Sequence, residues 1–400
     1  MTMALQQLGT IQTPDGILNS MICFDEDLPD EAMLHALRGD RTAPPTAALF
    51  ALEWNASKDK AQMIPKVRYE PHKNNSEITP AQLNPQEAEY FLGFRGSLIV
   101  QKNGSIRGTW KHANGKKGTF KYLSHTTNDE RVTATLCADW EAFKQWATTS
   151  RDIHGAGIFR GHGNRNFRLV TTLHREGRTR LERYCGDTLH QFRAHAEAVL
   201  GMRFNLSDGE EYSMLLGLAQ HHGLPTPLLD WSDSPYIAAF FAFSDALDSA
   251  SVRPDATHVR IYAITKEFIA ATYSPIVVLP FMTPYVSPLT ITGRHNPRLY
   301  AQQGKFLVTN VANLENYLCV MQRTRGRHDL IAADVPINCA GAALQDLKFM
   351  GLTASTMFPG LDGVCRMLRH DMSFNRESPI PSGKPAAEVP DEIKISNSSI

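Results

Sequence analysis

The hydrophobic positions of this chain follow different patterns on the two sides of residue 130. Residues 1–130 show little helical periodicity, and turn-forming segments such as Ala43-Pro-Pro-Thr46 and Asn84-Pro85 interrupt their short apolar runs. Short runs bounded in this way are typical of strands joined by turns. From residue 138 onward, apolar runs with helical spacing alternate with runs that suit strands. The pattern predicts a smaller β-rich N-terminal domain over residues 1–130 and one mixed α+β domain over 138–372.

The clearest strands of the first domain lie within residues 91–122. Asn103-Gly104 and Asn114-Gly115 supply the positive φ angles of two tight hairpin turns. Gly108-Thr-Trp110 recurs as Gly118-Thr-Phe120, so we expect a three-stranded meander with the two aromatic rings in matching positions. The meander is also basic, and it would either face an anionic partner or form a solvated face whose lysines block edge pairing, the commoner use of such a run. The basic residues are Arg95, Lys102, Arg107, Lys111, Lys116, Lys117 and Lys121.

The second domain begins with an aromatic helix and contains several further elements. Trp140, Phe143 and Trp146 are three residues apart, which predicts a helix over 138–147 with an aromatic core face. We expect further helices over 178–202, 343–351 and 360–368. Another helix should start at a cap formed by Ser207 with Glu210 and end at Gly223, and one more should start at Ser234-Pro235. Strands or extended segments are expected over 155–160, 258–264, 274–280 and from Lys305. Residues 375–400 are polar and rich in Pro, Ser and Lys, so we expect a disordered tail.

The stretch from Leu218 to Ala242 combines a dense apolar frame with a polar insertion. Its polar members are Gln220, His221, His222, Asp230, Ser232 and Asp233. Buried polar groups cost about 1–3 kcal/mol each when they lack a partner. Six of them beside a core predict either the lining of a pocket, which we favour, or an internal hydrogen-bond network.

Composition and charge narrow the class of protein. The chain has 400 residues, with 41 Lys and Arg balanced by 41 Asp and Glu, so no global charge draws it to nucleic acid or an anionic membrane. It has no secretory pattern and no run of about 18 apolar residues. The six cysteines are dispersed, as is typical of reduced thiols in a cytoplasmic protein. We therefore expect a cytoplasmic protein without membrane contact and, since no metal-ligand spacing occurs, without a bound metal.

Spaced motifs in residues 138–370 resemble the FRG domain, which is named for its Phe-Arg-Gly tripeptide. Here the tripeptide is Phe159-Arg160-Gly161, whereas a second copy at 94–96 has none of the companion motifs and is taken as coincidence. The companions are Leu173-His-Arg175, Leu218-Ala-Gln-His-His-Gly-Leu-Pro-Thr226, Leu228-Leu-Asp-Trp-Ser-Asp-Ser-Pro235, Gln302-Gln-Gly-Lys-Phe306 and Phe358-Pro-Gly-Leu-Asp-Gly363. The resemblance by itself implies no particular reaction.

The same segment has a weaker resemblance to the ADP-ribosyltransferase fold. That fold implies a split antiparallel sheet with flanking helices, with an Arg or His on the first strand, a Ser/Thr motif before a helix and a late Glu. Arg160, Ser232 and the pair Gln302 and Gln303 occupy these places in order, with glutamine where glutamate is usual. The resemblance implies a toxin-like effector that uses NAD as a substrate, of the kind found in prokaryotic stress responses or antiviral defence.

This resemblance assigns a role to each candidate residue. Arg160 would bind the pyrophosphate, Asp230 would orient His221 or the ribose, Ser232 would hold nicotinamide, and Gln303 would contact a ribose hydroxyl without supplying negative charge. These four are the candidate catalytic residues. The candidate NAD-binding residues are Phe159, Gly161, His162, His221, His222, Trp231, Tyr236 and Gln302.

Each assignment has an alternative. Arg160 and Asp230 could form a buried structural bridge, Trp231 could belong to the core, and only one of His221 and His222 can face a pocket, because they lie about 100° apart on a helix. A non-catalytic module that binds a nucleotide or peptide is the second hypothesis, and the macromolecular acceptor stays unknown. A nucleic-acid binder is the third, with a basic surface of Arg160, Arg165, Arg168, Arg175, Arg178, Arg180, Arg183 and Arg193.

Overall fold

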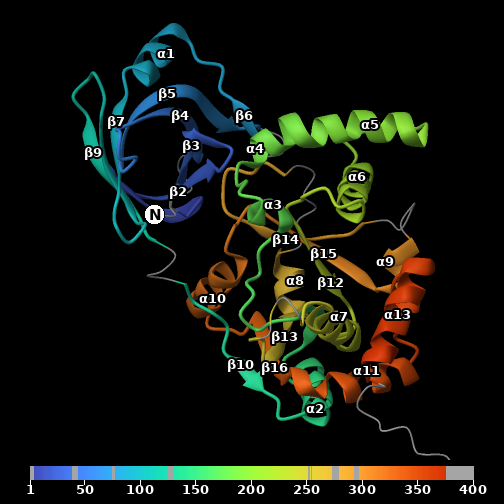
Figure 1. Ribbon diagram of the computed structural model, residues 1–400. Helices are drawn as coiled ribbons and strands as arrows, with labels where there is room; N and C mark the ends of the chain where they lie inside the picture. The colour runs from blue at the N-terminus through green and yellow to red at the C-terminus, as the bar shows by residue number, and fades with distance from the viewer. Residues whose placement is uncertain are drawn as a thin grey trace, which may run out of the picture.

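The computed structural model describes residues 4–37, 44–73, 77–124, 129–250, 253, 255–272, 279–291 and 297–374. A β-barrel forms the N-terminal part, and a sheet flanked by helices follows it (Figure 1). The α+β class and the β-rich N-terminal unit are thereby confirmed. The tail expected over 375–400 and most of the strand expected over 274–280 lie outside the described residues.

Eight strands of the N-terminal unit close into a barrel. The sheet order is β4-β3-β2-β1-β9-β8-β7-β5-β6, and an additional β4–β5 pairing closes the ring and leaves β6 attached to β5. A helix, α1 (Pro85–Leu92), connects β6 to β7 and starts with a capping box between Asn84 and Glu87. The strands are β1 (Gln6–Thr13), β2 (Gly16–Asp25), β3 (Leu28–Leu37), β4 (Thr46–Trp54), β5 (Lys60–Pro71), β6 (Ile78–Pro80), β7 (Arg95–Val100), β8 (Ile106–Lys111) and β9 (Lys117–Tyr122).

The meander expected over 91–122 corresponds to β7, β8 and β9. Gly108 lies opposite Phe120 and Trp110 lies opposite Gly118, so each aromatic ring covers the glycine of the neighbouring strand. A Cβ on Gly108 would lie 2.0 Å from the Phe120 ring, and one on Gly118 would lie 2.7 Å from the Trp110 ring. The repeated Gly-Thr-aromatic motif therefore packs aromatic rings over glycines toward the barrel interior.

The second unit is built on a seven-stranded sheet of order β10-β16-β13-β11-β12-β15-β14. All its neighbouring strands are antiparallel except β10 and β16, which are parallel. The pairing of β11 with β12 is reduced to Phe159 opposite Ser232, so the sheet is nearly divided at this point. The strands are β10 (Ala134–Leu136), β11 (Ala156–His162), β12 (Leu228–Ser232), β13 (His258–Thr265), β14 (Val286–Leu289), β15 (Gly304–Thr309) and β16 (Leu330–Pro336).

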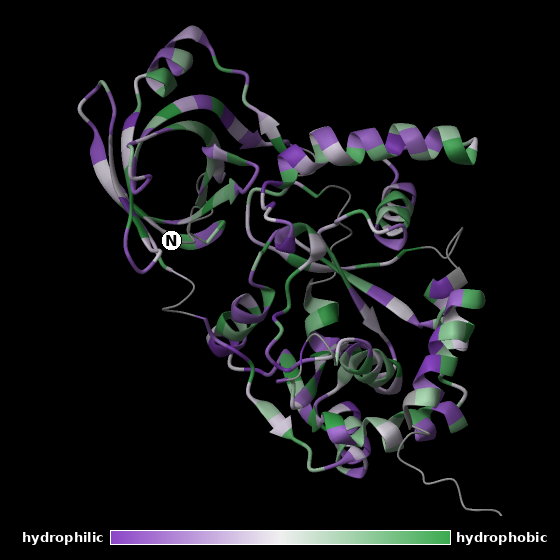
Figure 2. Ribbon diagram, in the orientation of Figure 1, coloured by the Kyte–Doolittle hydropathy of each residue, from purple (hydrophilic) through white to green (hydrophobic). Residues whose placement is uncertain are grey.

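Helices cover both faces of this sheet. Alternate residues of β13 divide between two hydrophobic clusters, with Ile261 facing α2, α7 and α11 and Tyr262 facing α8 and α10. The buried helix α7 consists mainly of hydrophobic residues (Figure 2). The helices are α2 (Trp140–Asp152), α3 (Thr172–Arg175), α4 (Leu181–Arg183), α5 (His190–Leu200), α6 (Gly209–His221), α7 (Pro235–Asp248), α8 (Lys266–Thr272), α9 (Pro297–Ala301), α10 (Leu314–Arg325), α11 (Ala340–Phe349), α12 (Ala354–Met357) and α13 (Leu361–Phe374). No described helix combines the length and apolar composition that are needed to cross a lipid bilayer.

Two helix predictions need correction. The helix expected over 178–202 begins only at Leu181 and contains a π-helical segment, Tyr184–Leu189, before α5. The chain at Thr179 and Arg180 is extended instead, because both backbone amides donate to Asp25 of the barrel. The cap of α6 is Asp208 rather than Ser207, since its carboxylate accepts from the backbone amides of Glu210 and Glu211. The stop at Gly223 is confirmed by its φ of +83° after the helix ends.

Candidate functional site

The Phe159-Arg160-Gly161 tripeptide lies at the C-terminal part of β11, where the strand passes beneath α7. A Cβ on Gly161 would lie 1.9 Å from the carbonyl oxygen of Ala238, so only glycine allows this approach. Phe159 is buried in the cluster that joins the sheet to α7. The strand thus presents the Arg160 side chain between two residues whose sizes fix the distance from strand to helix.

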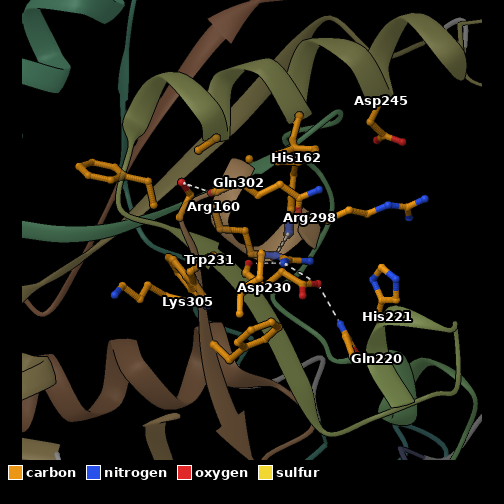
Figure 3. Close-up of a pocket in the computed structure, with 18 of the residues that line it drawn as sticks. Arg160, His162, Gln220, His221, Asp230, Trp231, Asp245, Arg298, Gln302 and Lys305 are labelled. Carbon is orange, nitrogen blue, oxygen red and sulfur yellow. Dashed lines mark hydrogen bonds and ion pairs between the residues drawn. The ribbon is translucent and has the colours of Figure 1, made fainter. Parts of the chain in front are cut away.

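Arg160 opens onto a cavity of about 820 Å³ (Figure 3). The ends of β11 and β12, the last turn of α6, the start of β15, α7, α9 and α13 contribute to its wall. Two carboxylates in this wall, Asp230 and Asp245, face a larger number of cations. The cations are Arg160, Arg168, Arg175, Arg253, Arg298, Lys305 and Arg366.

Not all of these cations are neutralised. Arg366, Arg168, Arg253 and Lys305 each form an ion pair with an aspartate. Within the part of the chain that the structure describes, Arg175 and Arg298 form no ion pair, and the closest carboxylate oxygen to Arg160 is 3.9 Å away, on Asp230. The cavity therefore concentrates positive charge that its own side chains do not balance.

The guanidinium of Arg160 is held by uncharged groups. Its Nη1 donates to the backbone carbonyl of Asp230 at 2.5 Å, and its Nε donates to Nε2 of His162 at 3.1 Å. Burial and the neighbouring Arg175 lower the pKa of Arg160, and Asp230 opposes this shift. Since only 17% of the Arg160 side chain is exposed, a bound anion would compensate a cation that water solvates poorly.

His162 is neutral in this arrangement. Burial, and then the charge of Arg160, lower its pKa well below the ordinary value of 6.5. A neutral ring can accept from Arg160 through Nε2, which a protonated ring cannot do. His162 therefore orients the arginine without competing for the anion that the arginine would bind.

Asp230 is not part of a buried bridge. Its side chain is 57% exposed, and its Oδ2 accepts from Nε2 of Gln220 at 2.9 Å. Gln220 is itself fixed, because its Oε1 accepts from the hydroxyl of Thr226. The last turn of α6 and the loop after it thus aim the carboxylate of Asp230 into the cavity.

The remaining candidate residues divide between two cavities. His221 lines the Arg160 cavity, whereas its neighbour His222 caps α6 and is exposed, which agrees with the expectation that only one of the two faces a pocket. Gln303 and Tyr236 line a second cavity of about 510 Å³, and Phe159 lines both. Gln303 has a φ of +46° and accepts through its backbone carbonyl from the amide of Asp233.

Ser232 and Gln302 line the Arg160 cavity but are engaged by the protein. The hydroxyl of Ser232 donates to the carbonyl of Gln302 at 2.9 Å and accepts from the amide of Ser234. The side-chain amide of Gln302 donates to the carbonyl of Met357. These two side chains therefore connect β12, the turn before β15 and α12.

Aromatic groups complete the wall. Trp231 is buried in the core beneath the cavity, and its indole Nε1 has no hydrogen-bond partner within the described part of the chain. Phe358 lies under two cations, with the guanidinium carbons of Arg298 and Arg366 5.7 and 5.0 Å from its ring centroid. Phe167 lies similarly 4.6 Å from Arg253. These faces offer flat apolar surface next to positive charge.

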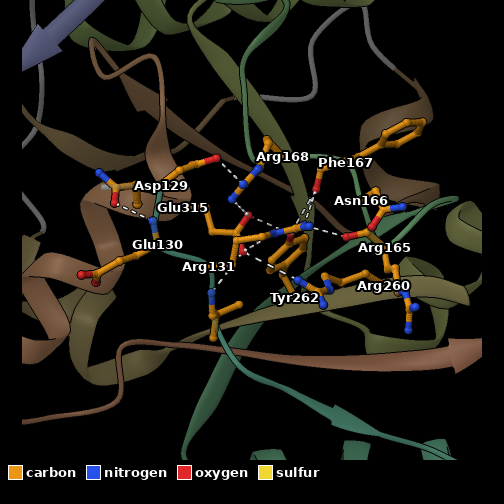
Figure 4. A network of polar contacts seen from close by, with 12 residues as sticks. Asp129, Glu130, Arg131, Arg165, Asn166, Phe167, Arg168, Arg260, Tyr262 and Glu315 are labelled. Atoms are coloured by element: carbon orange, nitrogen blue, oxygen red, sulfur yellow. Dashed lines mark hydrogen bonds and ion pairs between the residues drawn. The ribbon is translucent and has the colours of Figure 1, made fainter. Parts of the chain in front are cut away.

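A buried polar network supports the wall that carries Arg168 (Figure 4). At its centre, the fully buried Glu315 accepts from the backbone amide of Val132 and from the hydroxyl of Tyr262, both at 3.1 Å. Arg131, Arg168 and Arg260 lie 3.5, 3.9 and 3.7 Å from its carboxylate. The network joins the segment before β10 to α10 and β13, so it fixes the edge of the cavity from behind.

Seven of the eight arginines considered for a nucleic-acid surface divide between ion pairs and the cavity wall. Arg178, Arg180 and Arg183 pair with acids of the barrel, namely Asp27, Glu31 and Asp25. Arg160, Arg168 and Arg175 line the cavity, and Arg193 pairs with Glu197 on α5.

The site also contains residues that sequence reasoning missed. Gln220 belongs to the polar stretch, but its contact with Asp230 depends on the loop through Thr226. Arg298 and Arg366 come from segments more than 130 residues after Arg160 and carry no local signal. Phe358 lies within a quoted motif, so that motif marked the site without revealing its role. No group of three His, Cys, Asp or Glu side chains suited to a metal ion occurs among the described residues.

Comparisons with known proteins connect this site to a family. No curated protein matches the chain. Two solved structures are similar to it, a redesigned beta barrel with 13% identity over 30% of this chain and 87% of that chain, and a de novo fluorescence-activating beta barrel with 12% identity over 31% and 99%, each with a TM-score of 0.20. Residues 155–251, which hold Arg160, Gln220 and Asp230, match the family model of the FRG domain. The chain therefore contains an FRG domain.

Proposed function

We propose that the FRG domain binds NAD in the Arg160 cavity. The observation that carries this proposal is the group of Arg160, Arg175 and Arg298, which line one cavity in which, among the described residues, only Arg160 has a carboxylate oxygen within 4 Å, 3.9 Å away on Asp230. A planar guanidinium binds phosphate oxygens with two parallel hydrogen bonds, and the pyrophosphate of NAD offers such oxygens. The cavity volume of about 820 Å³ falls within the range of small-molecule sites.

The aromatic groups support a nucleotide rather than an inorganic anion. Phe358 and Phe167 present faces next to arginines, and a nucleobase or nicotinamide ring stacks on such surfaces. Two of the candidate NAD-binding residues, Trp231 and Tyr236, are less suited to stacking on the nicotinamide, since Trp231 is a core residue and Tyr236 lines the second cavity. We therefore assign ring stacking to Phe358.

Asp230 gives the proposed site a catalytic group. When the bond between nicotinamide nitrogen and ribose carbon breaks, its electron pair leaves with nicotinamide, and positive charge develops on the ribose carbon. A carboxylate near that carbon stabilises the cation. A hydroxyl of an acceptor, or water, then forms the new bond to the carbon and releases its proton to the surrounding water. Asp230 replaces the missing glutamate in this proposal, and Arg160 holds the pyrophosphate.

A second candidate function is a non-catalytic nucleotide-binding module. It is favoured by the third position of the predicted set, where Gln302 donates to Met357 and Gln303 lines the other cavity. Neither glutamine brings a carboxylate to Arg160. Under this hypothesis Asp230 serves only to bind a ribose hydroxyl.

The experiment combines a binding measurement with a turnover measurement. Calorimetry with ADP-ribose should detect binding to the whole protein, and Arg160→Gln should weaken it about 10- to 100-fold because one charge-assisted contact is lost. Asp230→Asn keeps the acceptor for Gln220, so it should change this affinity less than about threefold while lowering nicotinamide release at least about 100-fold. Arg193→Gln, on α5 outside the cavity, is the matched control.

The outcomes separate the hypotheses. Binding without nicotinamide release would support the non-catalytic module. Equal losses of binding in Arg160→Gln and Arg193→Gln, or no binding at all, would rule out the proposed site.

A further inference from the structure

The outer face of the barrel over β5, β7, β8 and β9 is arranged in three rows of side chains. The strand register places Arg95, Lys111 and Lys117 side by side in one row. A second row consists of Lys60, Ile99, Arg107 and Lys121. Between them lies a row of uncharged polar residues, Gln62, Ser97, Thr109 and Thr119. We call the six cations of the outer rows the basic face.

The basic face is unpaired. Residues 91–122 contain no Asp or Glu, although the chain as a whole has no net charge. All six cations are exposed, and none of them forms an ion pair within the described residues. The nearby Lys116, in the turn before β9, does pair with Asp15 at 3.5 Å. The absence of acids is thus a property of residues 91–122, which include β7, β8 and β9, and not of the whole barrel.

The closed barrel removes one explanation for these cations. Lysines on a strand often prevent pairing at a free edge, and the sequence alone allowed that role here. However, β7 pairs with β5 and β8, and β9 pairs with β8 and β1, so none of these strands has a free edge. Like charges directly opposite each other are destabilising, as in Arg95–Lys111, Lys111–Lys117 and Arg107–Lys121. A function that needs the charges would explain their retention.

The spacing suits the backbone of a nucleic acid. Neighbouring cations of one row lie on strands about 4.8 Å apart, and the two rows are four residues, about 13 Å, apart along each strand. The hydroxyl and amide groups of the middle row place hydrogen-bond donors between the two basic rows, and the hydroxyl oxygens of Ser97 and Thr109 lie 3.0 Å apart. Rows of cations with hydroxyl donors are typical of contacts to phosphate and sugar.

An exposed aromatic pair lies at one end of the basic face. Tyr90 stacks on His112, with ring centroids 4.1 Å apart and an interplanar angle of 12°, and 45% of Tyr90 is exposed. His112 directly follows Lys111, and its Nδ1 donates to the backbone carbonyl of Tyr90. Proteins that bind single strands combine a basic track with such stacking platforms, since an unpaired base can lie on the ring.

We propose that the basic face binds a single-stranded nucleic acid, with its phosphates on the two basic rows and one base on Tyr90. This proposal does not depend on NAD binding, because none of these residues lines the Arg160 cavity. It gives the barrel a partner of its own, next to an FRG domain that acts on a different ligand.

The test uses the whole protein and fluorescein-labelled strands of 20 nucleotides, measured by fluorescence anisotropy. One variant combines Arg107→Gln, Lys111→Gln, Lys117→Gln and Lys121→Gln. The matched control removes four exposed cations of the second unit, in Arg203→Gln, Arg323→Gln, Lys348→Gln and Arg369→Gln. Single-stranded RNA, single-stranded DNA and a DNA duplex are compared at several salt concentrations.

The basic-face variant should lose at least tenfold in affinity near 0.1 M salt, and the slope of log affinity against log salt should become shallower by about 3, since each lost phosphate contact contributes about 0.7. The control should keep both values. Tyr90→Ala should weaken single-strand binding at least about fivefold without changing the slope. RNA and DNA arms identify which strand is preferred.

Three results would overturn the proposal. These are no binding by the unmodified protein, equal losses in the two quadruple variants, and duplex binding as tight as single-strand binding. ADP-ribose affinity should be the same in the basic-face variant and the unmodified protein, so failure of one proposal leaves the other testable. A melting curve of each variant verifies that the barrel is folded.

Discussion

At the scale of single residues, Gly161 shows how the family tripeptide works structurally. Its contact with Ala238 brings β11 against α7, and the preceding residue, Arg160, lines the cavity. The tripeptide thus combines a core residue, a ligand-facing cation and a glycine that sets the spacing. Two of the three residues of the motif, Phe159 and Gly161, are therefore required for packing, and Arg160 faces the ligand site.

Gly161→Ala should destabilise the FRG domain by about 1–3 kcal/mol or more, because the new methyl group would overlap a backbone carbonyl that cannot rotate away. Urea unfolding followed by circular dichroism would measure the change in the free energy of unfolding. Gly186→Ala is the control. A Cβ at this position would meet no atom within 4 Å, and alanine is favoured over glycine inside a helix. Equal stability of the two variants would contradict the assigned role.

At the scale of elements, the segment before α4 joins the two units. The buried carboxylate of Asp25, at the end of β2, accepts from the backbone amides of Thr179 and Arg180 at 2.8 and 3.1 Å and from Arg183 at 3.0 Å. Glu26 donates its amide to the carbonyl of Gly177 nearby. This segment follows directly after Arg175, so the barrel helps to fix one wall of the cavity.

Asp25→Ala should therefore weaken the structure at the junction. The two buried amides of Thr179 and Arg180 would lose their acceptor and Arg183 would keep its contacts with Asp27, and breaking a buried charged contact costs about 3–5 kcal/mol. Hydrogen exchange should show faster exchange at the amides of Thr179 and Arg180 in this variant. Asp25→Asn keeps one acceptor oxygen for the two amides and should show a smaller effect, and identical exchange in Asp25→Ala and the unmodified protein would refute the role.

Local patterns predicted elements well where neighbours in the sequence determine the structure. The strand at 155–160, the helix that ends at Gly223 and the helix opened by Ser234-Pro235 all have local signals, and they correspond to β11, α6 and α7. By contrast, β12 has only five residues after Pro227, and its partner β15 lies more than 70 residues later. Its strand structure comes from that distant partner and not from its own pattern.

The extended start of the segment expected as a helix over 178–202 has the same cause. Its apolar spacing suits a helix, yet Asp25 draws the amides of Thr179 and Arg180 into contacts with the barrel.

The candidate site was predicted to a similar degree. Arg160, Asp230 and His221 come together as expected, while Arg298, Arg366 and the engagement of Ser232 depend on contacts across the fold.

At the scale of the whole molecule, the barrel could not be deduced from strand patterns, since closure depends on the pairing of β1 with β9 about 110 residues later.

The contact between the barrel and the second unit includes a neutral histidine. His35 on β3 is buried, and its Nδ1 donates to the carbonyl of Met282 at 2.9 Å. Burial lowers the pKa of His35 to about 4, and the hydrogen bond to Met282 opposes this shift.

This depressed pKa makes the stability of the molecule depend on pH. The unfolded chain, with an ordinary histidine pKa of about 6.5, binds a proton as the pH falls below that value, whereas the folded chain does not bind it until about pH 4. The contribution of His35 is therefore fully present above about pH 6.5 and declines as the pH falls toward 4. Between about pH 7.5 and pH 5 the loss should be about 2 kcal/mol.

The prediction is measured by urea unfolding at about pH 7.5 and pH 5, comparing the unmodified protein with His35→Asn. Asparagine can place an amide donor near the carbonyl of Met282 but does not titrate, so the variant should lose about 2 kcal/mol less than the unmodified protein on acidification. His174, whose pKa burial also lowers to about 4, adds a loss of the same sign in both proteins and cancels in the comparison. An equal loss of stability in the two proteins would show that protonation of His35 is not what destabilises the molecule in acid.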